Sequence, residues 1–316
     1  MADSKVIAVM GATGAQGGGL VKAILADPDK EFSARAITRN ADSDAAKALA
    51  AAGAEVVEAD LDDPPSIEKA FEGAYGAYCV TFFWEHLDAD KEIAHARVMA
   101  EAAKAAGVQH VVWSTLDDTR ELVPLEDDRM PTLQGKYKVP HFDAKGEADK
   151  LFTDLGLPVT LLRTVFYWDN MIYFGMGPQR GEDGVLAVTF PLGEAKMPSI
   201  AAEDIGKIAF GVFKRGDEFI GKAIGVAGEH VSGGDMAAVL TDVYGEEVRY
   251  NDVPADVYRG FGFPGADDVG NMFQFKRDFE DEYRASRDVD LARSLNPDLH
   301  TFRAWVEENK ESIPIG

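Results

Sequence analysis

The stretch that decides the fold is Val6-Ile7-Ala8-Val9-Met10-Gly11-Ala12-Thr13-Gly14-Ala15-Gln16-Gly17-Gly18-Gly19. Its apolar start, residues 6–10, is typical of a strand buried on both faces, and the glycines that follow indicate a tight turn. Residues 20–25 then return to helical spacing. The predicted order is therefore strand, glycine-rich loop and helix, which is the context that a phosphate-binding loop requires.

Three glycines of this stretch, Gly11, Gly14 and Gly17, are spaced three residues apart. Without side chains they would let the backbone approach a pyrophosphate and let the helix pack closely on the strand. The spacing G-x-x-G-x-x-G differs from the usual G-x-G-x-x-G fingerprint, so an ordinary loop with a glycine at the helix start is the alternative. The strand that follows indicates which nucleotide would bind.

That second strand, residues 32–40, carries Arg39 near its end, where an NAD-binding fold usually has an acidic residue for the ribose 2′-hydroxyl. A guanidinium is a planar fork of donors that suits a 2′-phosphate. The sequence therefore favours NADP(H) over NAD(H), and the alternative is a solvated arginine at a strand end.

Strands and helices alternate through the first half of the chain, which predicts an α/β fold with a Rossmann-type doubly wound parallel sheet. Ligands of such sheets bind beyond the carboxyl ends of the strands. Five features fall at predicted strand ends: the glycine loop, Arg39, Asp60, Thr81 and the pair Ser114 and Thr115. Asp60 could reach the adenine edge, and Leu61 could cover the ring.

After residue 170 the alternation is lost, so we expect two domains. Residues 1–170 would form the nucleotide-binding domain, and 171–316 a smaller α+β lobe that provides a substrate or partner surface, with some chain crossover between them. Residues 116–140 are polar and contain several prolines and acidic residues, which we interpret as a long and mobile loop before a helix that carries His141 and Lys145.

The composition excludes several classes of function. The formal net charge is −23, which disfavours direct contact with nucleic acid or anionic membranes. The six histidines and the lone Cys79 show no metal-ligand spacing, so no metal is expected. The amino-terminal apolar segment is too short for a membrane span or a signal peptide, and a cytoplasmic location is expected.

Several motifs together resemble the NmrA-like proteins and, among these, the HSCARG group of atypical short-chain dehydrogenase/reductases. The motifs are residues 11–17, 38–40, 80–85, 140–147 and 167–170. The resemblance implies an NADP(H)-binding Rossmann domain with a smaller carboxyl-terminal domain. Some members of the family are regulators that respond to the NADPH/NADP⁺ ratio, and others reduce quinones or related substrates.

The resemblance also implies which residues would contact the cofactor. The pyrophosphate would lie on the glycine loop, the 2′-phosphate on Arg39 with Asn40 beside it, and the adenine against Asp60 and Leu61. The remaining implied contacts, on the ribose and nicotinamide side, are Thr81, Phe82, Phe83, Lys145, Tyr167, Trp168, Asp169 and Asn170; on the loop they are Gly11, Ala12, Thr13, Gly14, Ala15, Gln16 and Gly17. The chain departs from the HSCARG pattern at Phe82 and Phe83, and at Ala94, where a lysine is expected.

Two functions of different classes remain. Typical short-chain dehydrogenases use a tyrosine as the proton donor and a lysine four residues later, and none of the nine tyrosines here has that lysine. This favours a redox sensor that binds a regulatory protein partner, in which NADPH would order residues 116–140. The alternative is an NADPH-dependent oxidoreductase for a quinone or another flat electrophile, with Phe82, Phe83, Tyr167 and Trp168 stacking on the substrate.

Lys145 is the candidate catalytic residue of that alternative, although it could serve only to bind the cofactor. His141 is interpreted as a helix-start residue rather than a general acid. A homodimer is left open.

Overall fold

A computed structural model describes residues 4–316, which divide into two compact units. The first unit comprises residues 1–118, 144–164 and 203–224, with residues 1–3 outside the description. The second comprises residues 119–143, 165–202 and 225–316. The chain thus passes between the units more than once, and segments lie on both sides of the boundary that the sequence places at residue 170.

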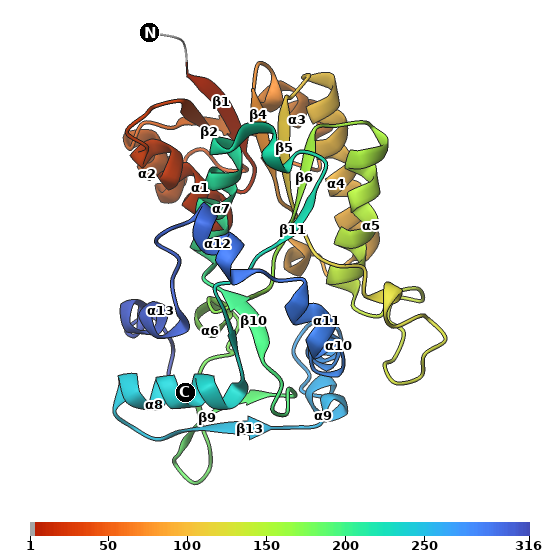
Figure 1. The fold of residues 1–316 in the computed structure, drawn as a ribbon, viewed down its shortest axis with the longest axis vertical. Helices are drawn as coiled ribbons and strands as arrows, with labels where there is room; N and C mark the ends of the chain where they lie inside the picture. The colour runs from red at the N-terminus through yellow and green to blue at the C-terminus, as the bar shows by residue number, and fades with distance from the viewer. Residues whose placement is uncertain (1–3) are drawn as a thin grey trace. The chain divides into compact units, whose positions relative to one another are not determined.

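The first unit is built on a seven-stranded sheet of order β11-β6-β5-β4-β1-β2-β3 (Figure 1). Neighbouring strands from β3 to β6 are all parallel. The strands are β1 (Lys5–Val9), β2 (Phe32–Thr38), β3 (Glu55–Glu58), β4 (Gly76–Cys79), β5 (His110–Thr115), β6 (Val159–Arg163) and β11 (Ala223–Gly225). The Rossmann-type parallel sheet that the sequence predicts is confirmed.

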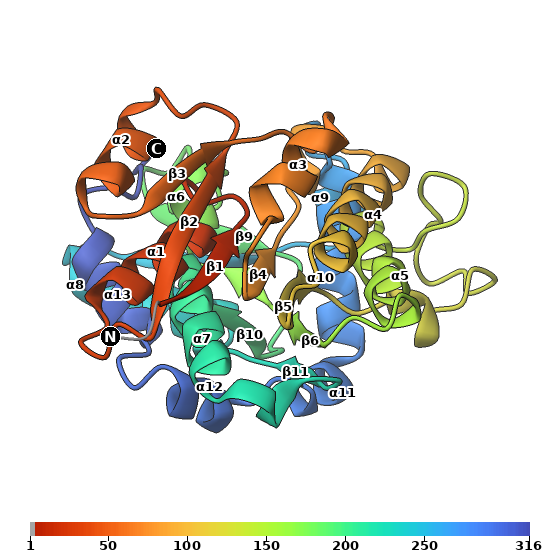
Figure 2. The same cartoon turned by 90° about the horizontal axis from the view of Figure 1, so that it is seen from above.

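Helices cover both faces of this sheet (Figure 2). On one face, α3, α4 and α5 enclose a core of alanines and larger side chains such as Phe71, Trp113 and Phe152. On the other, Phe32 of β2 packs against Phe210 and Phe213 of α7. The helices are α1 (Ala15–Ala26), α2 (Asp44–Ala51), α3 (Pro64–Phe71), α4 (Ala89–Ala105), α5 (Pro140–Asp154) and α7 (Ala202–Lys214), with 3-10 turns η1 (Phe83–Glu85) and η3 (Gly216–Phe219).

The second unit contains two three-stranded sheets, β12-β10-β7 and β13-β9-β8. Their strands are β7 (Phe166–Tyr167), β8 (Gln179–Arg180), β9 (Leu186–Phe190), β10 (Met197–Ile200), β12 (Glu229–Val231) and β13 (Val248–Asp252). The unit also holds η2 (Thr119–Glu121), α6 (Asn170–Tyr173), α8 (Gly233–Tyr244), α9 (Ala255–Arg259), α10 (Ala266–Asp278), α11 (Glu280–Ala285), α12 (Val289–Leu295) and α13 (Phe302–Asn309). Helices α9 to α12 are not predicted from the sequence; in α10, buried polar residues interrupt the apolar pattern.

The segment between β5 and α5 is long, as predicted, and hydrogen bonds to α5 and α10 hold it in place. Asp143 accepts hydrogen bonds from the backbone N–H groups of Thr119, Lys138 and Val139 at 2.8, 2.7 and 3.1 Å. Asn271 of α10 donates to the carbonyl of Lys138 at 2.6 Å. Residues 119–143 therefore belong to the second unit and are held there by these hydrogen bonds, and the mobility of the loop stays a prediction.

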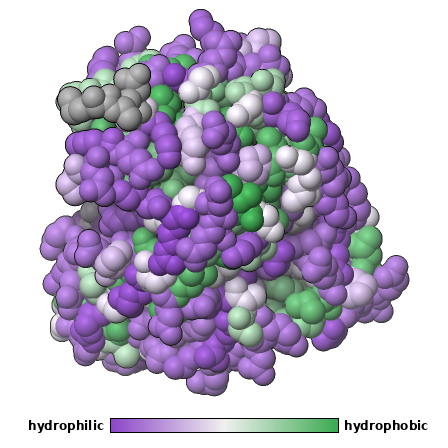
Figure 3. Space-filling view, turned by 45° about the horizontal axis from the view of Figure 1, so that its top comes forward, coloured by the Kyte–Doolittle hydropathy of each residue, from purple (hydrophilic) through white to green (hydrophobic). Residues whose placement is uncertain are grey.

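The drawn face of the molecule is mostly hydrophilic, with apolar side chains scattered between polar ones (Figure 3). Among the described residues, no helix has the length and apolar character needed to cross a membrane.

Candidate functional site

The predicted site residues of the first unit follow the carboxyl ends of its parallel strands. The glycine loop follows β1, Arg39 follows β2, Asp60 follows β3 and Thr81 follows β4. Since neighbouring strands of a parallel sheet end at the same edge, these residues share one edge of the unit. Lys145 reaches the same edge from α5, because its ammonium contacts Thr81.

The loop after β1 has the geometry that its glycines predict. Gly11 adopts a φ of +61°, a left-handed conformation that costs glycine little. Gly14 is the N-cap of α1, with no side-chain cap, and its N–H donates to the carbonyl of Gly11 at 2.9 Å. The first turn of α1 also has no acidic residue, so its positive end faces no fixed negative side chain of that turn.

Gly17 permits the close approach of α1 to this loop. A Cβ atom at Gly17 would overlap the backbone carbonyl of Gly11 and lie 2.8 Å from the carbonyl oxygen of Met10. The side chain of Gln16 points toward the sheet, where its Oε1 accepts hydrogen bonds from Tyr78 at 2.7 Å and Ser114 at 2.8 Å. The turn between β1 and α1 is thus compact and is lined by backbone atoms and small residues. A pyrophosphate site at a helix N-terminus requires such a lining.

Arg39 is paired in this structure. Its Nη1 donates to the Oε1 of Glu85, which ends the turn η1 after β4. The hydrogen bond to Glu85 raises the pKa of Arg39, and the nearby carboxylates of Asp60 and Asp62 add to this effect. Asp60 itself accepts a hydrogen bond from the N–H of Asp62 at 2.9 Å, which closes the turn after β3.

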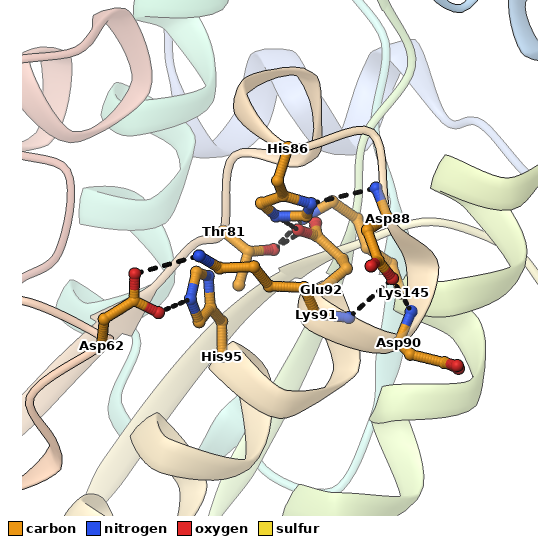
Figure 4. Close-up of polar contacts among 9 residues, drawn as sticks. All are labelled: Asp62, Thr81, His86, Asp88, Asp90, Lys91, Glu92, His95 and Lys145. Atoms are coloured by element: carbon orange, nitrogen blue, oxygen red, sulfur yellow. Dashed lines mark hydrogen bonds and ion pairs between the residues drawn. The ribbon is translucent and has the colours of Figure 1, made fainter.

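Lys145 belongs to a buried polar network (Figure 4). Its Nζ lies 2.9 Å from Oε1 of Glu92 and donates to the hydroxyl of Thr81 at 2.5 Å. The Thr81 hydroxyl in turn donates to the same Glu92 oxygen at 2.5 Å. The ammonium also lies 5.0 Å from the centre of the Trp113 ring. Glu92 is fully buried and the Lys145 side chain is 12% exposed, so the charge is oriented and partly shielded from water.

The ionisation of Glu92 depends on this network. Burial alone would raise the pKa of the carboxyl group, but the Lys145 ammonium and hydrogen bonds from His86, Thr81 and Lys145 lower it to about 2. The second carboxylate oxygen lies 3.3 Å from Nε2 of His86. The Nδ1 of His86 accepts from the N–H of Asp88 at 3.1 Å, so that Nε2 is the ring nitrogen that faces Glu92.

A second cluster of charged side chains joins α4 to the turn after β3. Asp62 binds Lys91 at 2.9 Å and His95 at 3.0 Å, and the rings of His86 and His95 meet edge to face (Figure 4). The hydrogen bonds from His95 and then Lys91 lower the pKa of Asp62 to about 2. The carboxylate of Asp62 is therefore compensated by its own neighbours.

The aromatic residues expected to stack on a substrate are placed differently from that expectation. Phe82 is 55% exposed, whereas Phe83 is 3% exposed and packs against Trp84 and His86. Trp168, in the second unit, is fully buried and donates to Ser199 at 2.8 Å. The expectation that four aromatic rings form a stacking surface is therefore corrected, because Phe83 and Trp168 are core side chains.

The other residues of the second-unit motif have local roles there. Asp169 accepts from the N–H of Ala202 at 2.8 Å, Asn170 begins α6, and Tyr167 is partly buried in β7. His141 pairs with Asp268, its Nδ1 lying 2.7 Å from Oδ1. This arrangement agrees with the interpretation of His141 as a helix-start residue.

Glu92 and His86 are not among the residues predicted from the sequence, and Glu85 is predicted only as part of the motif 80–85. A signal for Glu92 exists in the sequence: it occupies the buried stripe of α4 formed by Ala89, Ala96, Met99 and Ala103, at helical spacing. A carboxylate in such a stripe needs a buried cation as its partner. Only the folded chain identifies Lys145 as that cation.

The fold and the glycine-bearing edge define a Rossmann-type protein of the doubly wound class. A model of the NmrA-like family matches residues 3–306, and the chain belongs to this family. The resemblance found in the sequence is thereby confirmed.

A curated relative carries the same family name, and solved structures share the fold. The NmrA-like family domain-containing oxidoreductase FrzB of Cladobotryum sp is 29% identical over 331 residues, which cover 94% of this chain and 95% of FrzB. NmrA, a negative transcriptional regulator solved in complex with NADP, has a TM-score of 0.77 at 22% identity, covering 96% of this chain and 95% of NmrA. The NADPH-dependent quinone oxidoreductase QOR2 of Escherichia coli, complexed with NADPH, has a TM-score of 0.72 at 24% identity, covering 96% and 98%.

Proposed function

We propose that the first unit binds NADP(H) at the carboxyl edge of its sheet. The observation that carries the proposal is the combination of a glycine-rich turn at residues 11–17, in which a Cβ atom at Gly17 would overlap the backbone, with a guanidinium directly after β2. The loop and the first turn of α1 would hold the pyrophosphate, and Arg39 would hold the 2′-phosphate. The NADP and NADPH complexes of NmrA and QOR2 support this choice of cofactor.

Within this frame, we propose a redox sensor of the NADPH/NADP⁺ ratio as the function, with a regulatory protein partner and a cytoplasmic location. It is supported by the sequence, in which no tyrosine is followed by a lysine at the fourth position. It is supported also by the fold shared with a transcriptional regulator. In this role the buried carboxylate of Glu92 holds Lys145 where it can bind the nicotinamide ribose.

An NADPH-dependent oxidoreductase is the second candidate, and the name of FrzB, which matches nearly the whole chain, favours it. When bound, NADPH supplies a hydride, and reduction of a quinone to a hydroquinone also consumes one proton. In this role Lys145 would orient a ribose and donate that proton, and its contacts with Glu92 and Thr81 would fix the direction of its ammonium. The exposed ring of Phe82 would contact a flat substrate.

Cofactor choice is tested by measuring binding of NADPH and NADH to the Arg39→Ala variant. We expect NADPH affinity to fall about 10-fold or more, because a charge-assisted contact to phosphate is lost, and NADH affinity to change little. Equal losses for both nucleotides would show that Arg39 does not recognise the 2′-phosphate. Lys145→Ala should weaken both, whichever function is correct.

The two functions are separated by a single-turnover assay. The protein is loaded with NADPH and mixed with quinones and carbonyl compounds, and the absorbance of the reduced nicotinamide is followed. Rapid oxidation by one class of acceptor establishes the reductase and excludes a pure sensor. A flat signal with tight NADPH binding favours the sensor, and the search then turns to proteins that distinguish the NADPH-bound from the free form.

A further inference from the structure

We propose that Glu85 is an internal competitor for the 2′-phosphate position, so that NADP(H) binds only when the Arg39–Glu85 pair opens. The inference rests on the proposed function and adds a specificity-determining residue to it. Glu85 would set how strongly this chain prefers NADP(H) over NAD(H).

The geometry of the pair allows a phosphate to replace the Glu85 carboxylate on Arg39. Arg39 and Glu85 come from the exits of different strands, β2 and β4, and meet only through their side chains. Their side chains are 61% and 48% exposed, so both remain accessible to a dissolved anion. An exposed ion pair is weak, and a phosphate that carries up to two negative charges can replace a single carboxylate on a guanidinium.

A carboxylate also accepts a hydrogen bond from a second donor that follows β2. The N–H of Ala41, two residues after Arg39, donates to Oε2 of Glu58 at 3.0 Å. Asp62 differs, because Lys91 and His95 bind its two oxygens. Of the acidic residues that the structure describes around Arg39, Glu85 is the one in direct contact with the guanidinium, so its charge opposes an incoming phosphate most directly.

Opening of the pair would also reach the Lys145 network. Glu85 ends η1, and the next residue, His86, lies 3.3 Å from Glu92, which binds Lys145. NADP(H) would free the Glu85 side chain at the end of this turn, whereas NAD(H) would leave it paired with Arg39.

The test uses adenosine 2′,5′-bisphosphate and 5′-AMP, which differ only in the 2′-phosphate, and measures binding by calorimetry. For Glu85→Gln we expect the bisphosphate to bind about 3- to 10-fold more tightly and 5′-AMP to be unchanged, because an exposed ion pair and one unit of repulsion are removed. Glu85→Ala should give the same result without a glutamine that could still bond Arg39. Glu101→Gln, an exposed position on α4, removes the same charge as a control and should leave both affinities unchanged.

The double variant Arg39→Ala/Glu85→Gln isolates the route of the effect. Relative to Arg39→Ala alone, it should gain less affinity for the bisphosphate than Glu85→Gln gains over the wild type, because the competition for Arg39 is absent and only the direct repulsion by Glu85 is removed. The inference is overturned if the Glu85 variants match Glu101→Gln, or tighten both nucleotides equally. If neither nucleotide nor NADPH binds the unmodified protein, the proposed function itself fails, which is a different result from binding without a Glu85 effect.

Discussion

Among single residues, Glu92 carries a buried charge, and its contribution to folding stability depends on the ion pair with Lys145. Glu92→Gln keeps the oxygen that binds Thr81 but leaves the ammonium without its counter-charge. Loss of one partner of a buried pair typically costs about 3–5 kcal/mol, and we expect about 3 kcal/mol here because Lys145 retains some exposure. Urea unfolding at pH 7 measures the change, with Glu101→Gln as the exposed control.

The same pair predicts a pH dependence. The folded-state pKa of Glu92 is about 2, below the ordinary value of 4.5, so its stabilisation is complete above pH 4.5 and is lost as the pH falls toward 2. The stability gap between the wild type and Glu92→Gln should therefore shrink steadily below pH 4.5. A gap that stays constant down to the acid transition would contradict a charged Glu92.

For Asp149 we expect the opposite dependence of folding stability on pH. Burial raises its pKa to about 7, although hydrogen bonds from Thr115 and Trp113 oppose the shift. A raised carboxyl pKa favours the folded state below the ordinary value of 3.8, and this contribution is lost as the pH rises through 7. Both donors bind the same oxygen, Oδ1, which an amide also provides.

We therefore expect Asp149→Asn to be more stable than the wild type at pH 8, by about 3 kcal/mol, and to lose this advantage near pH 4. Urea titrations at pH 4, 6 and 8 measure the difference. If the two proteins show parallel stability profiles, Asp149 ionises normally in the folded state.

At the scale of elements, the contact between α1 and the loop after β1 depends on a single missing methyl group. Gly17→Ala would drive a Cβ into the carbonyl of Gly11, and the helix would have to move. We expect about 1–3 kcal/mol of destabilisation, together with weaker binding of any pyrophosphate ligand.

Gly18→Ala is a matched control in the same helix, because its Cβ would lie 3.2 Å from the carbonyl oxygen of Ala12. There the helix propensity of alanine, up to about 1 kcal/mol, offsets the tight contact. Thermal unfolding and ligand affinity are compared for the two variants. Equal effects would mean that the backbone contact at Gly17 does not decide the loop geometry.

At the scale of the whole molecule, the net charge of −23 is the dominant electrostatic feature. Repulsion between its carboxylates destabilises the folded chain at low salt, and at about 1 M salt the screening length falls to about 3 Å. We expect the unfolding temperature to rise in molar KCl. This would be consistent with a source that keeps high internal salt, and an unchanged temperature would contradict that hypothesis.

Much of the first unit could be predicted because its signals are local. The apolar run before Gly11, the alternation of strands and helices and the place of Arg39 all derive from neighbouring residues in the sequence. The second unit was less predictable. Its α10 buries Asp268, Asn271, Gln274 and Lys276, so its pattern does not separate polar from apolar faces.

By itself, the sequence determined the Rossmann-type fold, the glycine loop and the arginine that favours NADP(H), because strand periodicity, glycine spacing and position after a strand are short-range properties. Three features depend on the packing of the folded chain: Glu92 binds Lys145, Glu85 pairs with Arg39, and Phe83 is buried. Glu92 and Lys145 are far apart along the chain, and their pairing exists only once α4 and α5 pack on the same face of the sheet.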